Sequence, residues 1–328
     1  MPTKPKPQPA KNLTLNPKTL GGGRAPKGSI RSAERGTKAP GTPAPEPEPL
    51  KTISLDGEII TLLDFGLKGD ILLDVTFDNA YCRRSLLDLG TSKQPRFSNV
   101  PLSSEGIPNE RVVYRVQLET LKKTSKYFER LLTDIRFAEA KTINTAFQDL
   151  AIKGIKPEAA APEDLPRISI REDEDATQVC GRSGVFSDLL RILHGQDTTS
   201  KLSMPHLAVL AVMADRFDCA PTIGRYARGG RRIAWPQTSG QVTFSTEEGT
   251  RMKILVAWYL EDVGQFSKST KELIMRGSLR WIGRAEREEE QVGVWWDFPD
   301  GIEGLLCTFL HSNSLQYILF STSGAGGF

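Results

Sequence analysis

Cysteine is scarce in this sequence, and its placement argues against two kinds of site. The four cysteines, Cys82, Cys180, Cys219 and Cys307, are scattered singly. None belongs to a Cys-x-x-Cys pair, and none lies beside a histidine at ligand spacing, so neither a zinc site nor a disulfide framework is expected. We predict a reducing compartment in which the thiols act as small buried hydrophobic groups.

Long hydrophobic runs are also missing. The start, MPTKPKPQPAK, is basic but is followed by no apolar segment, so it does not have the pattern of a secretory signal. The most apolar late segment, residues 305–320, is interrupted by His311 and the polar residues after it, and is too short and too polar to cross a bilayer. The sequence therefore predicts no membrane partner and a cytoplasmic or nuclear protein.

Charge and histidine content give little support to nucleic-acid binding or catalysis. The net charge is only +3 over 328 residues, which is not the balance of a dedicated DNA-binding protein. The three histidines, His194, His206 and His311, form no credible catalytic triad or metal set. We expect His194 to act at a helix end, where a cation favours the dipole, and His206 to be exposed. No catalytic residue, metal ligand or cofactor is predicted.

The basic residues are concentrated in the first part of the chain. Up to Lys51 there are seven lysines and three arginines against three glutamates, a charge of about +7, which leaves about −4 for the rest. Residues 1–50 are rich in proline and lysine and have almost no large apolar side chain. We expect them to form a disordered tail. The stretch GGGRAPKGS within it lacks the residue order of a phosphate-binding loop.

An α+β fold follows from the order of the elements expected after this tail. Residues 51–66 have the pattern of a hairpin with an Asp-Gly turn, and the runs at 69–77, 111–116 and 165–170 have that of strands. Helices are expected over 118–137, 184–195, 204–219, 251–264, 269–277 and 279–290. Ser183 is the predicted cap of the second of these, and Gly195 its end.

Three domain ranges are predicted. The tail at 1–50 is followed by a domain over 51–228, with long loops near 79–110 and 138–166. Residues 229–328 form a small helical extension with an irregular C-terminal end. Within the domain, the acidic segment 171–177 is expected to be a solvated turn, and residues 226–232 a solvated loop.

Five of these motifs, in this order, resemble the BTB/POZ family, most closely its fungal branch. They are GDILLDVTF, RVVYRV, LETLKKTSKYFERLL, LPRISI and FSDLLRILHG, and the resemblance covers about Gly69 to Cys219. It implies a helical cluster flanked by a short sheet. The family's Leu, Ser and Phe positions fall on Leu121, Ser125 and Phe128.

The resemblance gives each of these residues a role. Leu121 would anchor a short helix in the core, and Ser125 would cap the next helix at a tight corner. Phe128 would be buried against the sheet, while Tyr127 would stay partly exposed with a wet hydroxyl. Outside the resemblance, Trp295 and Trp296 are adjacent apolar anchors, equally consistent with a core position and with an interface.

The sequence departs from the family in three places. Many members have a histidine where Gln117 lies. Many homodimeric members pair a buried aspartate, here Asp74, with a basic residue at the position of Leu118. Without that residue, Asp74 lacks its family partner, so a monomer or weak dimer is expected. The segment VCGRSGVF also lacks the glutamate of cullin-binding members.

The resemblance implies a non-enzymatic protein–protein interaction module. Two alternatives stay open. One is a substrate adaptor of a cullin ubiquitin ligase, and the other is a nuclear regulator that uses the basic tail to associate with nucleic acid. The partners implied are other proteins, with weak self-association or a cullin among the candidates.

Overall fold

The computed structural model describes part of the chain. The described residues are 51–65, 68–80, 82, 84–90, 108–173, 175–198, 202–229, 233, 235–237, 241–278 and 293–298. The chain divides into two units, 1–48 and 49–328, and all described residues belong to the second. The predicted tail, the predicted helix at 279–290 and the C-terminal end lie outside the described residues.

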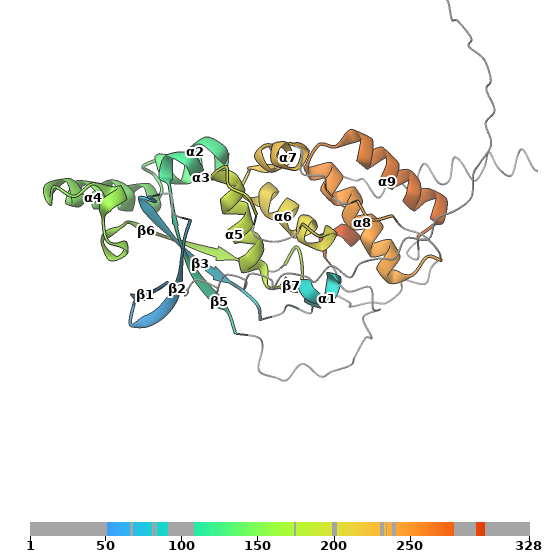
Figure 1. Cartoon of the computed structure of the whole chain (residues 1–328), viewed down its shortest axis with the longest axis horizontal. Helices are drawn as coiled ribbons and strands as arrows, with labels where there is room; N and C mark the ends of the chain where they lie inside the picture. Colours follow the sequence, from blue (N-terminus) through green and yellow to red (C-terminus); the bar gives the residue numbers. More distant parts are fainter. Residues whose placement is uncertain are drawn as a thin grey trace, which may run out of the picture. The chain divides into compact units, whose positions relative to one another are not determined.

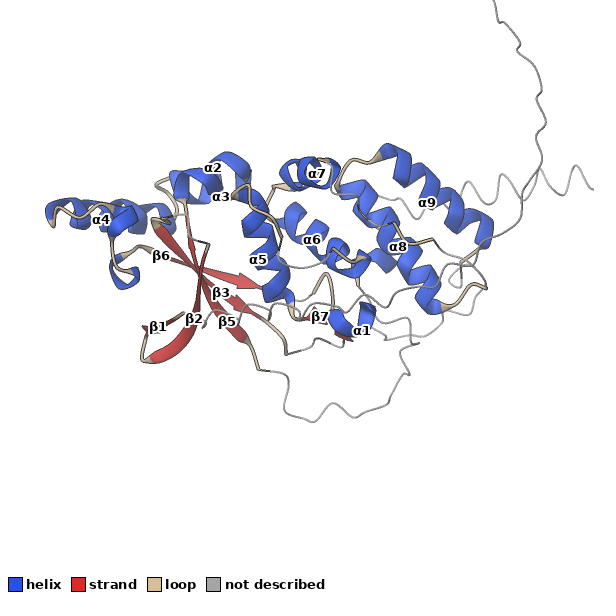
Figure 2. Ribbon diagram, in the orientation of Figure 1, coloured by secondary structure: helices blue, strands red, loops and turns tan. Residues whose placement is uncertain are grey.

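The described part is a mixed α+β structure (Figures 1 and 2). The main sheet contains β1 (Thr52–Leu55), β2 (Glu58–Asp64), β3 (Ile71–Phe77), β5 (Glu110–Val116) and β6 (Arg167–Glu172), and β4 (Arg84–Ser85) pairs with β7 (Val179–Cys180). The helices are α1 (Leu86–Gly90), α2 (Leu118–Thr124), α3 (Lys126–Thr133), α4 (Ala138–Ile152), α5 (Arg182–Leu193), α6 (Met204–Arg216), α7 (Ala220–Arg228), α8 (Phe244–Tyr259) and α9 (Val263–Arg276). Short 3-10 turns are η1 (Pro157–Ala159), η2 (Pro162–Asp164) and η3 (Val294–Trp296).

The main sheet has the strand order β1-β2-β5-β3-β6. β3 pairs antiparallel with β5 and parallel with β6, while β2 pairs parallel with β5 and antiparallel with β1. β3 is the most buried strand because its run ILLDVTF is apolar on both faces except at Asp74 and Thr76. The strands predicted at 69–77, 111–116 and 165–170 are confirmed.

The predicted hairpin is also confirmed. Leu55 pairs with Glu58, so only Asp56 and Gly57 form the turn. Both have positive φ, 55° and 82°, as a two-residue hairpin turn of the mirror-image type requires. An Asp-Gly pair adopts this conformation at little cost, which explains why the sequence signal was reliable.

The inner face of the sheet carries the main hydrophobic core. Alternate residues of β3, among them Leu73, Val75 and Phe77, pack with residues of α2, α3, α5 and α6. The C-terminal helices share this core, because α8 lies against α6 and α9, and its Ile254 and Leu255 are fully buried. The helical extension and the preceding helices are therefore packed together.

The loop predicted near 138–166 is wrong over its whole first half, because residues 138–152 form α4. Ala140, Ile143 and Leu150 are buried and Phe147 is half-buried, at helical spacing on one side of α4. This period was present in the sequence, but the alanine, proline and glutamate content of the whole segment obscured it. The loop near 79–110 also contains β4 and α1, and residues 91–107 lie outside the described residues.

A second, smaller core lies on the outer face of the sheet. It gathers apolar residues from the hairpin, β3, β5, α4 and the turns after α4: Ile53, Ile60, Leu62, Leu72, Val113, Leu150, Ala160 and Leu165. This cluster attaches the hairpin to the domain. It covers only part of the outer face, and the remainder is polar around Asp74.

The ends of α5 differ in part from expectation. Gly181, with φ of 80°, precedes the helix, and Ser183 lies inside the first turn, so the predicted Ser183 cap is wrong. The Ser183 carbonyl instead accepts a hydrogen bond from the Tyr114 hydroxyl at 3.1 Å. Gly195, with φ of 72°, follows the helix as predicted. Among the described helices, none is long and apolar enough to cross a membrane.

Candidate functional site

The corner between helices α2 and α3 brings together Leu121, Ser125, Tyr127 and Phe128, to which the resemblance gave roles. We call it the helical corner. Ser125 is 2% exposed and lies between the two helices. Its Oγ accepts a hydrogen bond from the Phe128 backbone N–H at 3.1 Å, which confirms the predicted N-cap. The same hydroxyl donates to the Phe217 carbonyl at the end of α6, at 2.6 Å. Ser125 thus ties the corner to a helix far along the chain.

Aromatic rings fill this corner. Phe128 is fully buried and stacks on Phe217, with ring centroids 5.5 Å apart and an interplanar angle of 4°. Tyr127 is half-buried and meets both rings edge-on, and burial raises the pKa of its hydroxyl. Leu121 is fully buried in the same core. The role of this corner is therefore to hold the fold, and its buried residues offer no surface to a partner.

Asp74 has a partner, contrary to the expectation from Leu118. Arg111 donates from Nε to Asp74 Oδ1 at 2.9 Å and from Nη2 to Oδ2 at 2.7 Å, a two-pronged contact. Arg167 Nε lies 3.8 Å from Oδ2. Val113 is the residue directly opposite Asp74, so Arg111 is its diagonal neighbour on β5. The family pattern places the cation at Leu118, before α2, whereas the cation in this chain comes from the neighbouring strand β5.

The turn of the hairpin folds over this ion pair. Asp56 accepts hydrogen bonds from Arg111 at 3.0 Å and from Arg167 at 2.8 Å, and Glu58 accepts from Arg111 at 2.9 Å. Arg111 and Arg167 come from β5 and β6, the two strands that flank β3. Asp56 therefore spans the outer face above Asp74, which is only 4% exposed. The two arginines lower the pKa of Asp56, and Asp74 above all raises the pKa of Arg111.

This arrangement leaves one side of the hairpin exposed. β1 ends the strand order, so its outer edge pairs with no other described strand. Ile59, on β2, is 80% exposed although it is a large apolar residue. We call β1 and Ile59 together the hairpin surface. An unpaired strand edge with an apolar side chain beside it is a common place for another chain to bind.

We predict that Arg111→Leu lowers the free energy of unfolding by about 3 kcal/mol, because Asp74 would stay buried with only the more distant Arg167 nearby. Denaturant titration of the full chain measures this loss. Arg171→Leu is the matched control, since Arg171 is 75% exposed on β6 and pairs with Asp78 at the surface. Equal stability of the Arg111 and Arg171 variants would contradict the role given to Arg111.

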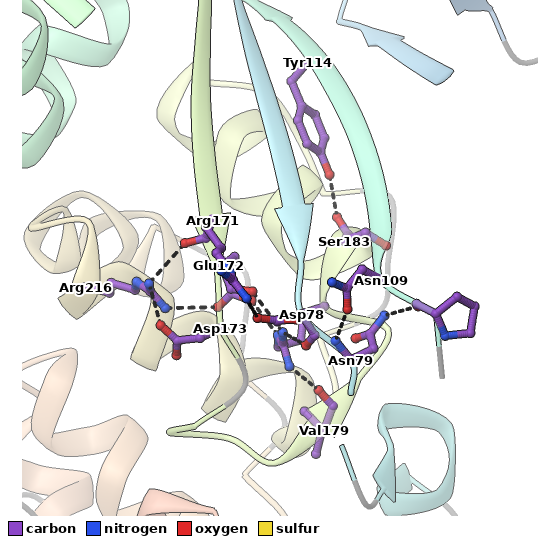
Figure 3. Close-up of polar contacts among 12 residues, drawn as sticks. Asp78, Asn79, Asn109, Tyr114, Arg171, Glu172, Asp173, Val179, Ser183 and Arg216 are labelled. Carbon is purple, nitrogen blue, oxygen red and sulfur yellow. Dashed lines mark hydrogen bonds and ion pairs between the residues drawn. The ribbon is translucent and has the colours of Figure 1, made fainter. Parts of the chain in front are cut away.

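A second polar cluster lies where β3 and β6 end (Figure 3). Glu172 is 4% exposed and Arg182 is fully buried, and Arg182 Nε donates to Glu172 Oε2 at 2.5 Å. Arg182 also donates to the carbonyls of Asp78 and Val179 at 2.6 and 2.7 Å. The segment 171–177 was expected to be a solvated turn, and at Glu172 this is wrong. Its glutamate completes β6 and points inward.

The outer part of this cluster is an exposed set of ion pairs. Arg216 of α6 contacts Asp173 at 2.8 Å and reaches Glu172 at 3.7 Å, and Arg171 donates to Asp78 (Figure 3). Burial raises the pKa of Glu172, and the arginines oppose this rise. The carboxylates of this cluster are thus held by guanidinium groups, and the cluster joins β3, β6, α5 and α6.

Trp295 and Trp296 lie in the core rather than on the surface. They are 0% and 5% exposed, and their indole N–H groups both donate to Oε1 of Glu248, at 3.1 and 3.4 Å. Arg84, from β4, donates to the same oxygen. Of the two readings of this tryptophan pair, the structure favours the core. Sequence reasoning missed Glu248, because no local signal marks a glutamate in α8 as the acceptor for residues far away.

His194 is the C-cap of α5, as predicted, but neither described histidine has the expected environment. His194 Nε2 accepts from the Gln117 N–H at 3.1 Å, and its Nδ1 contacts the Leu190 carbonyl at 2.7 Å, which assigns a neutral ring. Burial lowers its pKa, so the predicted cation at this helix end is wrong. His206, expected to be exposed, has a side chain only 12% exposed beside Asp188. His311 lies outside the described residues.

Cys82 and Cys219 are buried, as predicted, whereas Cys180 is only half-buried. Burial raises the pKa of the Cys219 thiol to about 12, which makes it a poor nucleophile. Within the described part of the chain, no group of three or more histidine, cysteine, aspartate or glutamate residues is placed to hold a metal ion.

No protein-family model, curated protein or solved structure matches this chain.

Proposed function

We propose that this chain is a non-enzymatic protein–protein interaction module of BTB/POZ type. The helical corner is the observation that carries the proposal. Leu121, Ser125 and Phe128, which carry the sequence resemblance, meet at one packed junction of α2, α3 and the end of α6. In the chain, α2 and α3 lie between β5 and β6, which flank β3 on its two sides. A helical cluster against a short sheet is what the resemblance implies.

The hairpin surface is the part of this module that we propose contacts a partner protein. Ile59 is 80% exposed, and the edge of β1 is unpaired among the described strands. The ionic contacts of Asp56 and Glu58 fix the hairpin on the domain, so its exposed side is presented in a defined orientation. A fixed binding element loses less conformational entropy on association than a mobile one.

Affinity capture with the tagged full-length chain, followed by mass spectrometry, tests the proposal. The wild type should retain a reproducible set of proteins. Ile59→Lys should lose part of this set, because it replaces the exposed apolar side chain of the hairpin surface with a charge. Ile152→Lys is the matched control, since Ile152 is 85% exposed on α4, and its set should be unchanged.

The identity of the captured molecules separates the open alternatives. A cullin that also binds the purified chain would favour the ubiquitin-ligase adaptor. Retention that depends on nucleic acid, falls steeply with salt and disappears when residues 1–50 are deleted would favour the nuclear regulator. Equal recovery of every protein by the wild type and Ile59→Lys would contradict binding through the hairpin surface.

Self-association is expected to be weak. Asp74 finds its cation, Arg111, within its own chain, so a second copy is not needed to neutralise it. We predict that the full-length protein sediments mainly as a monomer at micromolar concentration. Sedimentation equilibrium over a range of concentrations measures this directly. A dimer that persists on dilution and dissociates in the Ile59→Lys variant would show that the hairpin surface joins two copies.

A further inference from the structure

A groove of about 260 Å³ lies along α8, beside the first turn of α6 and next to α1. Figure 1 shows these three helices close to one another. Its α8 wall consists of Ser245, Glu248, Gly249 and Met252, which form one helical stripe. The remaining lining residues are Leu89, Ser203, Met204, Pro205 and Pro236.

Glu248 gives this groove an unsatisfied acceptor. The residue is 5% exposed, and its Oε1 takes hydrogen bonds from Arg84, Trp295 and Trp296. The donors to this carboxylate among the described residues all bind Oε1, which leaves Oε2 without a described donor. Glu248 lines the groove, and since Oε1 is already occupied, Oε2 is the oxygen left for a ligand donor. A carboxylate oxygen in such a site gains from a donor that a ligand brings.

The charge balance around Glu248 favours a neutral donor. Arg84 already compensates the carboxylate, so a second cation would be repelled by the guanidinium group. A hydroxyl or an indole N–H avoids this repulsion. The chain already supplies two indole N–H groups to the other oxygen of Glu248, which shows that such donors suit this acceptor.

The walls and the size of the groove favour an aromatic ring. Met204, Met252 and Leu89 offer apolar and polarizable surface, and thioethers pack well against aromatic rings. Pockets for drug-sized ligands occupy roughly 300–1,000 Å³, so this groove suits one large side chain. Tyrosine and tryptophan combine a ring with a neutral donor, and both are frequent anchors in protein interfaces.

We propose that this groove binds a tyrosine or tryptophan side chain of a partner protein. The ring packs against Met204 and Met252, and its O–H or N–H donates to Glu248 Oε2. That the aromatic side chain belongs to a partner protein rests on the proposed interaction function. The affinity of the groove for an aromatic donor does not, because it follows from the groove itself.

NMR titration of the full-length protein with p-cresol and with indole tests the site, with toluene as the analogue that lacks a donor. The indole N–H resonances of Trp295 and Trp296, assigned with Trp→Phe variants, should shift on binding. p-Cresol should bind about tenfold or more tighter than toluene, because the donor meets a charged acceptor. Equal affinities for p-cresol and toluene would overturn the assignment of Glu248 Oε2 as the acceptor for the ligand's donor.

Gly249→Leu blocks the groove without disturbing its walls. A Cβ added at Gly249 meets no atom within 4 Å, and leucine favours a helix more than glycine does. The variant should fold normally and bind p-cresol at least about tenfold more weakly, since the leucine fills the space of the ring. Gly184→Leu, at an equally open position in α5, is the control and should bind as the wild type does.

The outcomes separate this inference from the proposed function. Unchanged p-cresol binding by Gly249→Leu, or no binding by the wild type, would overturn the groove as a site, even if affinity capture still recovers partners. Binding that Gly249→Leu abolishes supports the groove. If the wild type then captures no protein, the groove stands and the proposed function fails.

Discussion

Phe128→Ala is expected to lower the free energy of unfolding of the full chain by about 3–5 kcal/mol, the usual cost of removing a buried phenylalanine. Phe128 is fully buried, stacks on Phe217 and meets Tyr127 edge-on, so the variant would leave a cavity at the junction of α3 and α6. Ser125 fixes both helices at this point and limits collapse of the cavity. Chemical denaturation followed by circular dichroism measures the change.

Phe137→Ala is the matched control for this experiment. Phe137 is also a phenylalanine near α3, at the N-cap of α4, but it is 43% exposed. Its truncation should cost much less, because solvent already covers a large part of the ring. If the denaturation midpoint of Phe128→Ala equals that of the wild type, the helical corner does not form as described.

Arg182→Met is the second change with a large expected effect. Arg182 is fully buried and holds Glu172, which is 4% exposed, so the variant leaves a buried carboxylate without its closest cation. Removing one partner of a buried ion pair usually costs about 3–5 kcal/mol. Arg136→Met is the control, because Arg136 is 86% exposed in its contact with Asp134 and its loss should change stability little.

The loss of stability in Arg182→Met should depend on pH, and the pKa of Glu172 sets the direction of this dependence. Burial raises the pKa of Glu172 above its ordinary 4.5, while Arg182 and Arg216 oppose this rise. Without Arg182 the folded-state pKa rises further. A raised carboxyl pKa favours the folded state below the unfolded pKa, and this stabilisation is lost as pH rises through the folded pKa.

The difference in free energy of unfolding between Arg182→Met and the wild type should therefore be smaller in acid, where Glu172 takes up a proton, than at neutral pH. Denaturation midpoints of the wild type and the variant, measured side by side from acid to neutral pH, give this difference. A loss of stability that is the same at every pH would mean that Glu172 is not the group left without compensation.

Local patterns in the sequence predicted much of the backbone structure. The hairpin at Asp56 and Gly57, the buried run of β3 and the cap at Ser125 each depend on residues within a few positions of one another. Such signals survive in the folded protein because turn, strand and cap preferences act locally. The apolar period of α4 is also present in the sequence, but the alanine, proline and glutamate content of the whole segment is more typical of a loop.

The ion pairs could not be predicted in this way, because their partners come from distant parts of the chain. Arg111 meets Asp74 only through the register of β3 and β5, and Arg182 meets Glu172 only once β6 and α5 are in place. Glu248 gathers Arg84, Trp295 and Trp296 from two other regions. Each depends on tertiary structure, which residue spacing alone does not give.

The affinity of the purified full-length chain for its most enriched captured protein tests the central claim most directly. Isothermal titration of wild type, Ile59→Lys and Ile152→Lys gives the three dissociation constants under one set of conditions. We predict saturable binding by the wild type, at least about tenfold weaker binding by Ile59→Lys and no change for Ile152→Lys. No captured protein that binds the purified chain, or identical constants for all three, would contradict an interaction module that works through the hairpin surface.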